Sequence, residues 1–429
     1  MHPGDTPESL TTSPRSRPER QLALAEEDLR PWLSLATLPG AGPRGLNRLL
    51  DRFGDPDRLL GASHRDLAAA GARPTLIQAL RQPRPDLVQA ALDWAQGEGT
   101  HLLARPDPRY PSRLAELTDA PLVLYVRGDP GALSDPQLAM VGSRNPTPGA
   151  RETTLAFARH LAACGLTITS GLAIGIDGAA HEGALEAGRT LAVMGTGPDR
   201  IYPAAHRDLA RRIAAQGALV TEFPPGLGPK SDHFPRRNRL IAALGLGTLV
   251  VEAALQSGSL ITARLAAERG REVFAIPGSI HNPLARGCHA LIKQGAKLVE
   301  TAQDILEELA PLLMGFLGPD APSPSGRAPA APGEDGAAAK ASPSLAGSNL
   351  GSAPLASATQ ASPALTSLDA DYRRLLEAMG QDPVHADTLV HRTGMGANDV
   401  SSMLLLLELE GWIAACPGGR YCRLGARPN

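Results

Sequence analysis

Between about residues 101 and 300, short apolar runs of strand length alternate with amphipathic stretches of helical length. This alternation predicts a parallel sheet with helices on both faces, a Rossmann-like α/β domain. The run Leu249-Val250-Val251 is apolar without a break, as expected for a strand that is buried on both faces. The predicted strands cover residues 122–127, 137–142, 166–170, 190–195, 218–222, 246–252, 272–276 and, more weakly, 297–300. The predicted helices lie near residues 148–164, 178–187, 204–216, 235–244, 258–269 and 286–294.

The segments on either side of this region predict further units, because 429 residues exceed one compact core. Ala, Pro, Ser and Gly fill 36 of the 47 positions in 318–364, a composition that cannot bury enough apolar surface to offset its ordering entropy. The last segment predicts three helices and a Gly-tipped hairpin, a winged helix. The predicted organisation is a disordered tail at 1–28, a small helical domain (helix-hairpin-helix or SAM-like) at 29–100, the Rossmann-like domain at 101–315, a linker at 316–365 and a winged helix at 366–429.

Both flanking domains leave their roles open. The Gly-rich turn at 38–43 opens a helix and resembles a helix-hairpin-helix element, in which backbone N–H groups meet a phosphate. The alternative is a structural turn, which the balance of 12 Lys and Arg against 13 Asp and Glu in residues 1–100 favours. The third helix of the winged helix has no Lys or Arg between 393 and 419, whereas a helix that reads DNA brings such side chains to the groove. This favours packing or protein binding.

The overall composition excludes several classes of protein. The net charge of −2 excludes a histone-like polycation and an acidic tail protein. The four cysteines (Cys164, Cys288, Cys416 and Cys422) form no CxxC pair, which argues against a disulfide scaffold or a zinc site and fits a reducing cytoplasm. The first twenty residues lack the apolar core of a signal peptide, and no apolar run reaches the ~18 residues of a membrane span. We therefore expect a cytoplasmic protein with no membrane partner, metal or cofactor.

Loops rich in glycine and serine follow several of the predicted strands. Gly142-Ser143-Arg144 follows the strand at 137–142, Ser170-Gly171 ends the strand at 166–170, and Ser257-Gly258-Ser259 opens the helix after 246–252. Gly195-Thr196-Gly197 ends a further strand. In an open parallel sheet such loops line one crevice, where glycine lets a ligand approach the backbone N–H groups. Together with Arg144, they predict an anionic ligand.

A basic turn lies close to these loops in the sequence. Three arginines fall within four residues in Phe234-Pro235-Arg236-Arg237-Asn238-Arg239, and Lys230 precedes Phe234 by four residues. Arginine matches phosphate with a bidentate fork, and an aromatic ring stacks on an unpaired base. The alternative is a solvated helix start with one arginine in a structural ion pair. For Arg144, likewise, the alternative is an ion pair that holds its loop closed.

Four motifs in the central region resemble the DNA-processing protein A family (DprA, also called Smf). They are VGSR at 141–144, SGLAIGID at 170–177, FPRRNRLIA at 234–242 and VVEAALQSGSLITARLAAERGREVFAIPG at 250–278. The resemblance implies a Rossmann-like domain that binds single-stranded DNA, forms dimers and loads the RecA recombinase onto incoming DNA in natural transformation. The predicted DNA-binding residues are Gly142, Ser143, Arg144, Ser170, Gly171, Lys230, Phe234, Arg236, Arg237, Asn238, Arg239, Ser257, Gly258 and Ser259.

Two other functions remain open at this point. Gly247-Thr248 followed by Glu252 faintly resembles the PGGxGTxxE motif of nucleoside-monophosphate phosphoribohydrolases, although the leading Pro-Gly-Gly is missing. The sequence offers acid and base candidates, but no nucleophile–base–orienter trio, so we predict no catalytic residue. These candidates are Asp177, His181, Glu222, Asp232, His233 and Glu252. The second alternative is a pure protein-interaction scaffold.

The end of the central region predicts a homodimer. The segment near 285–300 is apolar and ends the sheet, so it offers an edge strand that needs covering. The alternative is that a helix at 301–314 covers this edge within one chain. The predicted interface residues are Cys288, His289, Leu291, Ile292 and Leu298.

Overall fold

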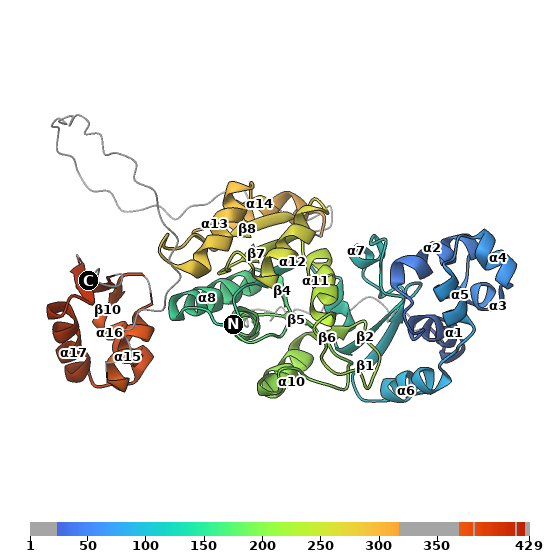
Figure 1. The fold of residues 1–429 in the computed structure, drawn as a ribbon, viewed down its shortest axis with the longest axis horizontal. Coiled ribbons are helices and arrows are strands. Elements are labelled where there is room, and N and C mark those ends of the chain that lie inside the picture. The colour runs from blue at the N-terminus through green and yellow to red at the C-terminus, as the bar shows by residue number, and fades with distance from the viewer. Residues whose placement is uncertain (1–23, 317–368, 381, 417, 425–429) are drawn as a thin grey trace, which may run out of the picture. The chain divides into compact units, whose positions relative to one another are not determined.

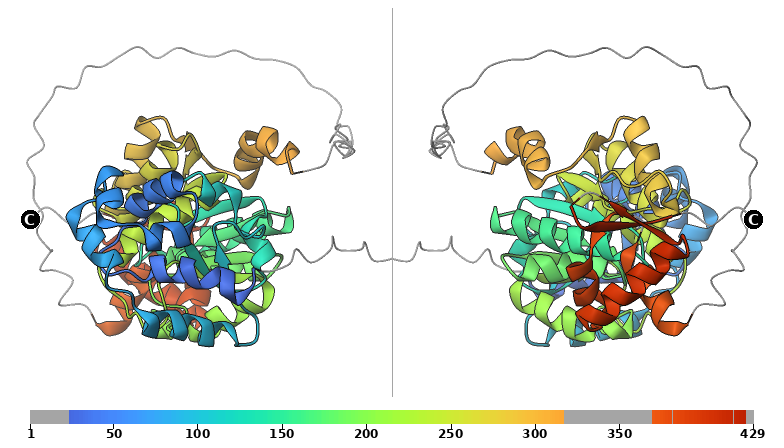
Figure 2. Two further views of the ribbon diagram at one scale, coloured as in Figure 1. Left: turned by 90° about the vertical axis from the view of Figure 1, so that its right-hand side faces the viewer. Right: turned by 90° about the vertical axis from the view of Figure 1, so that its left-hand side faces the viewer.

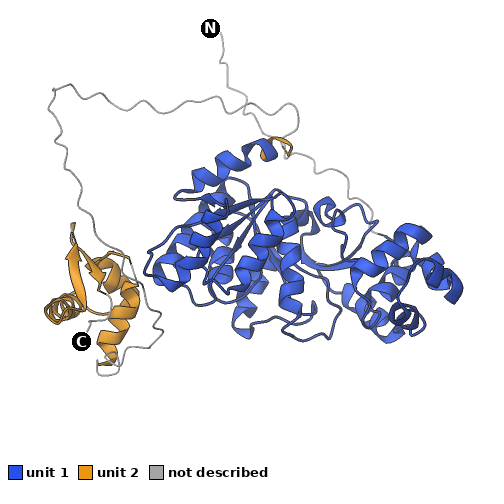
Figure 3. Cartoon of the chain, turned by 45° about the horizontal axis from the view of Figure 1, so that its top comes forward, with its two compact units in different colours: residues 1–312 blue, residues 313–429 orange. Residues whose placement is uncertain are grey.

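The protein is described by a computed structural model, which covers residues 24–316, 369–380, 382–416 and 418–424. The chain divides into two compact units, Met1–Leu312 and Leu313–Asn429, shown in blue and orange in Figure 3. Most of the predicted tail and nearly all of the predicted linker lie outside the described residues. The part of the tail inside them differs from the prediction, because a helix already begins at Glu26.

The first unit begins with six short helices. Their starts follow from the sequence, since four of them have Pro in the first turn, where its missing N–H costs nothing. Their leucines form a core that continues onto the first two strands through Leu102 and Tyr125. The helical segment is therefore packed on the edge of the sheet. The helices are α1 (Glu26–Ala36), α2 (Pro43–Phe53), α3 (Pro56–Gly61), α4 (His64–Ala69), α5 (Pro74–Leu80) and α6 (Pro85–Ala95).

The turn at 38–43 does open a helix, as predicted. Gly40 has φ +69°, and Gly42 caps α2 without a side-chain hydrogen bond. On α2, Asn47 donates through Nδ2 to the carbonyl of Ala120 at 3.0 Å, and Arg44 faces Asp119 at 3.7 Å. These contacts tie α2 to the segment that precedes the second strand.

A nine-stranded sheet forms the centre of the first unit (Figure 1). The strand order is β1-β2-β6-β5-β4-β3-β7-β8-β9, and all neighbours from β6 to β9 pair in parallel. The strands are β1 (Thr100–Ala104), β2 (Val123–Gly128), β3 (Gln137–Val141), β4 (Thr167–Ser170), β5 (Thr190–Val193), β6 (Ala218–Thr221), β7 (Gly247–Val250), β8 (Glu272–Ala275) and β9 (Lys297–Leu298).

Two strands correct the sequence prediction. β1 was not predicted, and β2, predicted at 122–127 as part of a parallel sheet, pairs antiparallel with both β1 and β6. The apolar run of β2 is buried at four of its six positions. Such a run indicates burial but not direction, because a covered antiparallel strand shows the same pattern as a parallel one.

Helices cover both faces of the parallel part, as predicted and as the side views show (Figure 2). On one face, α9 and α10 pack on β5 and β6 around Leu172, Leu209 and Leu219. On the other face, α11 and α12 pack on β3, β7 and β8. The helices are α7 (Ser112–Ala115), α8 (Pro148–Ala163), α9 (Ile176–Leu185), α10 (Arg207–Gln216), α11 (His233–Leu244), α12 (Gly258–Ala267), α13 (Arg286–Lys293) and α14 (Ala302–Met314), with short 3-10 turns at Pro130–Leu133, Ala204–His206 and Pro283–Ala285.

The second unit is a winged helix, as predicted. Three helices enclose a core that includes Leu375, Leu389 and Leu404, and three short strands pair in the order β10-β12-β11. The third helix exposes Leu405 and Leu409. The elements are α15 (Ala370–Met379), β10 (Val384–His385), α16 (Ala386–Thr393), α17 (Ala397–Leu409), β11 (Ile413–Cys416) and β12 (Arg420–Arg423).

Candidate nucleic-acid interface

A cleft of about 570 Å³ lies at the carboxyl ends of the central strands of the first unit. The loop after β3 forms one side with Gly142 and Arg144, and the start of α11 forms another with Phe234 and Asn238. The start of α12 closes a third side. We call this site the Arg144 cleft. Its lining is Val141, Gly142, Arg144, Ala173, Asp177, Ser231, Phe234, Pro235, Arg237, Asn238, Ile241, Ser257, Gly258, Ser259, Ile261 and Thr262.

Arg144 is the exposed cation of this cleft. Its guanidinium carbon lies 5.7 Å from the centre of the Phe234 ring, in cation–π geometry. The ring of Tyr202 lies on Phe234 at a centroid distance of 5.8 Å. Within the described residues Arg144 forms no ion pair with a carboxylate, so the alternative of an ion pair that closes its loop is not what the structure shows.

The N-terminus of α12 presents backbone N–H groups to the same cleft. Ser257 caps the helix by accepting from the Ser259 backbone N–H at 3.3 Å, and the two serine hydroxyls are 2.7 Å apart. Asn238 of α11 donates to the Gly258 carbonyl at 3.4 Å, which links the two helices that flank the opening. Hydroxyl groups and a helix N-terminus together favour an anion at this position.

Two buried charged side chains, Asp177 and Arg237, form the floor of the cleft. Asp177 accepts from the backbone N–H groups of Gly171 and Ala173 at 3.1 and 3.3 Å, and Arg237 donates to the Val193 carbonyl at 3.1 Å. Burial raises the pKa of Asp177 and lowers the pKa of Arg237 to about 10, and each group opposes the shift of the other. Arg237 therefore stays charged at neutral pH, with one face turned to the cleft.

Gly171 is required for this arrangement. A Cβ atom at this position would lie 1.5 Å from Nη1 of Arg237 and 2.6 Å from the Asp177 carboxylate. Leu172, which follows, has φ +61°, an uncommon conformation for a bulky residue and one that clusters at functional sites. The turn Ser170-Gly171-Leu172 thus leaves room for the buried side chain of Arg237.

The Arg144 loop is held by its neighbours. Gly175 has φ +85°, and a Cβ there would lie 2.3 Å from the Ser143 carbonyl oxygen. The Arg144 loop therefore packs directly on the backbone of Gly175. Glu252 at the end of β7 accepts from the backbone N–H and the hydroxyl of Thr147 at 2.9 and 3.1 Å, and from Asn282 at 2.9 Å. Preorganisation of this kind keeps Arg144 in place before a ligand arrives.

Comparisons with known proteins identify the family of this chain. Residues 101–310 match the model of the DNA recombination-mediator protein A family, and residues 359–419 match the DprA winged helix domain. Protein Smf of Escherichia coli K12 is 42% identical over 339 residues, which are 79% of this chain and 81% of that protein. The chain belongs to the DprA/Smf family.

A further relative, from Streptococcus pneumoniae, supports this assignment by its sequence and by its solved structure. The DNA processing protein DprA of Streptococcus pneumoniae is 47% identical over 203 residues, 47% of this chain and 72% of that protein. The solved structure of Streptococcus pneumoniae DprA superposes with a TM-score of 0.58 and 36% identity, and covers 67% of this chain and 99% of that one. The protein is thus a DNA-processing protein of this family.

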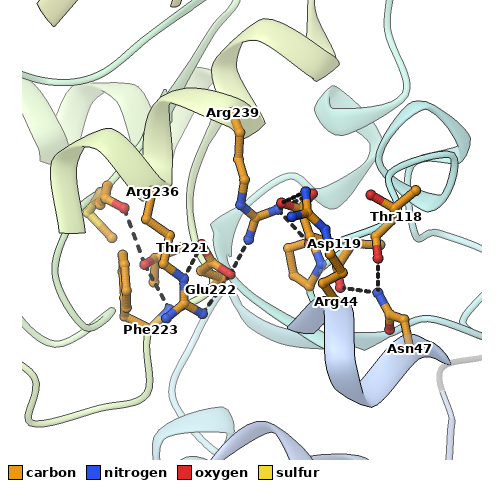
Figure 4. Close-up of polar contacts among 12 residues, drawn as sticks. Arg44, Asn47, Thr118, Asp119, Thr221, Glu222, Phe223, Arg236 and Arg239 are labelled. Carbon is orange, nitrogen blue, oxygen red and sulfur yellow. Dashed lines mark hydrogen bonds and ion pairs between the residues drawn. The ribbon is translucent and has the colours of Figure 1, made fainter. Parts of the chain in front are cut away.

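The structure separates the three arginines of the basic turn. Arg237 lines the Arg144 cleft, whereas Arg236 and Arg239 both point to Glu222, as Figure 4 shows. Arg236 donates to the two Glu222 oxygens at 3.1 and 3.0 Å, and Arg239 donates to Glu222 and to the Asp119 carbonyl. Arg239 is buried by these contacts, so the alternative of a structural ion pair describes it better than DNA contact.

The other predicted site residues also differ in whether they line the Arg144 cleft. Lys230 is exposed and does not line the cleft, although the next residue, Ser231, does. Ser170 is buried and donates to the Met140 carbonyl at 2.6 Å, and Ser143 accepts from the Asn145 backbone N–H, so neither lines the cleft. Sequence reasoning missed Tyr202, although the Gly-rich end of β5 pointed to the loop that carries it.

All of the acid and base candidates except Asp232 have structural partners. The Glu252 and Glu222 carboxylates accept the hydrogen bonds described above, and His233 lies 3.1 Å from the Gly195 carbonyl. His181 is fully buried with Nδ1 2.6 Å from the Thr190 hydroxyl, and burial lowers its pKa to about 3. Asp232, just before α11, is exposed. Among the described residues, no cluster of three or more His, Cys, Asp or Glu side chains could hold a metal ion.

The predicted dimer residues lie on α13 and β9. Leu298 is exposed on the edge strand, while His289, Leu291 and Ile292 are half-buried. Cys288 corrects the prediction, because this residue of α13 is fully buried, with its Sγ 3.6 Å from the Val250 carbonyl oxygen. Lys297 of β9 pairs with Glu308 of α14 at 2.8 Å, so α14 contacts this edge. No helix in the described part of the chain is both long and apolar enough to cross a membrane.

Proposed function

We propose that the Arg144 cleft binds single-stranded DNA. The observation that carries this proposal is the exposed guanidinium of Arg144 over the half-buried ring of Phe234, at the mouth of a recessed cleft. A cation beside an aromatic ring provides for the two parts of an unpaired nucleotide, since the cation pairs with the phosphate and the ring stacks on the base. A stiff duplex keeps its bases inside the stack and cannot offer one to a recessed ring.

The other groups of the cleft take complementary roles in this proposal. Arg144, Lys230 and the N-terminus of α12 around Ser257–Ser259 hold phosphates. Phe234 receives a base, and Asn238 lies beside it for polar contacts. Arg237 supplies fixed positive charge from the floor. Arg236 and Arg239 do not contact the strand in this proposal but anchor α11 to Glu222.

The family supports a wider role for this binding. We propose that the protein acts in the cytoplasm, where it protects incoming single strands and loads a RecA recombinase onto them in natural transformation and recombination. Its partners are then single-stranded DNA, RecA and a second copy of the chain. The dimer forms through the β9 edge, where Leu298 is exposed at the end of the sheet.

A salt titration with matched oligonucleotides tests the DNA proposal. Fluorescence anisotropy should show binding of a single strand that weakens as salt rises, because bound phosphates release counterions, and much weaker binding of a duplex of the same length. Equal affinity for the two forms would contradict a recessed single-strand site, and no binding to either would favour a protein-interaction scaffold. Release of base from AMP in a parallel assay would favour the phosphoribohydrolase alternative.

A further inference from the structure

A second pocket, of about 560 Å³, opens in the first unit beside the Arg144 cleft. It lies between β2, the 199–202 loop and α10. Four arginines line it, together with a floor that includes the buried side chains of Leu219 and Ala210. We call it the four-arginine pocket; its arginines are Arg127, Arg200, Arg207 and Arg211. None of them was singled out by the sequence motifs, because they come from three separate segments of the chain.

The positive charge of this pocket is only partly neutralised. Arg211 pairs with Asp208, and the Arg200 Nε lies 3.6 Å from the Asp199 carboxylate, which also accepts from the Gly226 backbone N–H. Within the described residues, the exposed side chains of Arg127 and Arg207 face no carboxylate at ion-pair distance. Arg207 and Arg211 are one helical turn apart on α10, so both reach the same side of the pocket.

The shape and chemistry of the pocket fit a nucleotide. Guanidinium groups at its rim match phosphate oxygens, and its apolar floor can take the flat face of a base or a sugar. Tyr202, 51% exposed, stands at the edge with its ring accessible for stacking. A free nucleoside phosphate and a nucleotide within a strand share this chemistry. The position of the pocket relative to the Arg144 cleft indicates which of the two it binds.

The pocket adjoins the Arg144 cleft. Tyr202 lines the four-arginine pocket and Phe234 lines the cleft, and their ring centroids are 5.8 Å apart. Pro229 belongs to the pocket and Ser231 to the cleft, which places the exposed Lys230 between the two. A strand leaving Phe234 therefore meets Lys230 and Tyr202 before it meets the arginines.

We propose that the four-arginine pocket is a second contact surface for the same single strand, holding nucleotides beyond those bound in the Arg144 cleft. This inference rests on the proposed function of the cleft. It predicts that affinity grows with strand length until both surfaces are occupied. Short strands engage the Arg144 cleft alone, because that cleft combines the ring with the helix N-terminus.

The test compares two strand lengths in the full chain with Arg127→Ala and Arg207→Ala combined. Oligonucleotides of about 4 and about 16 nucleotides span the usual range of single-strand site sizes. We expect affinity for the longer strand to fall about tenfold or more, and its salt slope to become shallower by about 1.4, the value for two released counterions. Affinity for the shorter strand and the melting temperature should stay unchanged. The matched control combines Arg52→Ala and Arg159→Ala, two exposed arginines elsewhere.

The outcomes separate this inference from the proposed function. If the wild type binds neither strand, the proposed function itself fails. If the wild type binds both strands, two results would refute the second surface. One is that the variant loses the same factor of affinity for both strands, and the other is that it loses affinity for neither. A further arm measures dTMP binding by the quenching of tyrosine fluorescence. A loss of dTMP binding in the variant, with binding of the longer strand intact, would make the pocket a site for free nucleotides and overturn the inference.

Discussion

At the scale of single residues, similar side chains in one motif have different roles. Arg144 is exposed over Phe234, while Arg237 is buried beside Asp177 and Gly171. The difference is environmental, because an exposed guanidinium exchanges water for a phosphate at little cost, whereas a buried one must be paired at all times. Ligand binding is therefore most sensitive to Arg144, and folding to the buried pair.

Arg144→Ala should weaken binding of single-stranded DNA tenfold to a hundredfold. Loss of one charge-assisted phosphate contact costs about 1.5–3 kcal/mol. The salt slope should become shallower by about 0.7, while the melting temperature stays constant because Arg144 makes no ion pair among the described residues. Arg159→Ala, on the exposed side of α8, is the control. A melting temperature lowered by several degrees with an unchanged salt slope would contradict the assignment.

His181 should make the protein less stable as the pH falls. Burial lowers its pKa to about 3, below the usual value of about 6.5, so the unfolded chain binds the proton first and stability drops between these two values. At pH 5 the loss is about 2 kcal/mol relative to pH 7. Denaturant unfolding of the wild type and His181→Gln at both pH values checks this. If both proteins lose the same amount, His181 is not the titrating group.

At the scale of elements, helix geometry explains the basic turn. α11 begins at His233, so Arg236 and Arg239 fall three positions apart on one face and share Glu222, while Arg237 points toward the sheet. The Arg239 contact with Asp119 continues toward Arg44 of α2 (Figure 4). The same network thus holds α11 in place and reaches the N-terminal helices.

Glu222→Gln should destabilise the first unit by about 3 kcal/mol. The substitution removes the charged partner of Arg236 and leaves the buried Arg239 with only the more distant Asp119 carboxylate, at 3.6 Å. Thermal and denaturant unfolding measure the loss. Glu182→Gln, which breaks the exposed pair with Arg151, is the matched control and should cost no more than about 1 kcal/mol. Similar losses for the two variants would show that the buried network adds no stability.

Leu298→Arg should convert the proposed dimer to a monomer. β9 is a two-residue strand at the end of the sheet, and a charge on an edge strand opposes pairing with another chain. Light scattering at micromolar concentration gives the mass directly. Leu409→Arg changes another exposed leucine, on α17, and should leave the mass unchanged. A monomeric wild type would contradict an interface at β9. So would a dimer that Leu409→Arg dissociates and Leu298→Arg does not.

At the scale of the whole molecule, each unit has its own hydrophobic core. The Arg144 cleft and the four-arginine pocket are built only from residues of the first unit. The winged helix has a separate core, and its third helix presents Leu405 and Leu409 rather than cations. These side chains suit contact with protein better than contact with a DNA groove.

Removal of residues 317–429 should leave single-strand affinity within about twofold, because phosphate contacts from the winged helix are not expected. The affinity of the shortened chain for the longer oligonucleotide, measured over a salt series, checks this. A shallower salt slope in the shortened chain would show that the winged helix does contact DNA.

The sequence alone was sufficient for most strands and helices and for several of the loops that line the Arg144 cleft. Apolar periodicity depends on local chain geometry, and the carboxyl ends of parallel strands meet at one edge whatever the side-chain details. Arg144, Phe234 and the Ser257–Ser259 turn were found in this way. β1 and the direction of β2 were not, because the apolar pattern of a buried strand carries no information about its partners.

Only the tertiary structure decided which charged groups are free. In the sequence, Arg236, Arg237 and Arg239 are equivalent, and Cys288 belongs to an apolar segment that could face a partner. Their roles depend on groups distant in the chain: Glu222 and Asp119 for two arginines, Asp177 for the third, and the Val250 backbone for Cys288. The same holds for the four-arginine pocket. Charge neutralisation and burial arise between segments, so they become visible only when the chain is folded.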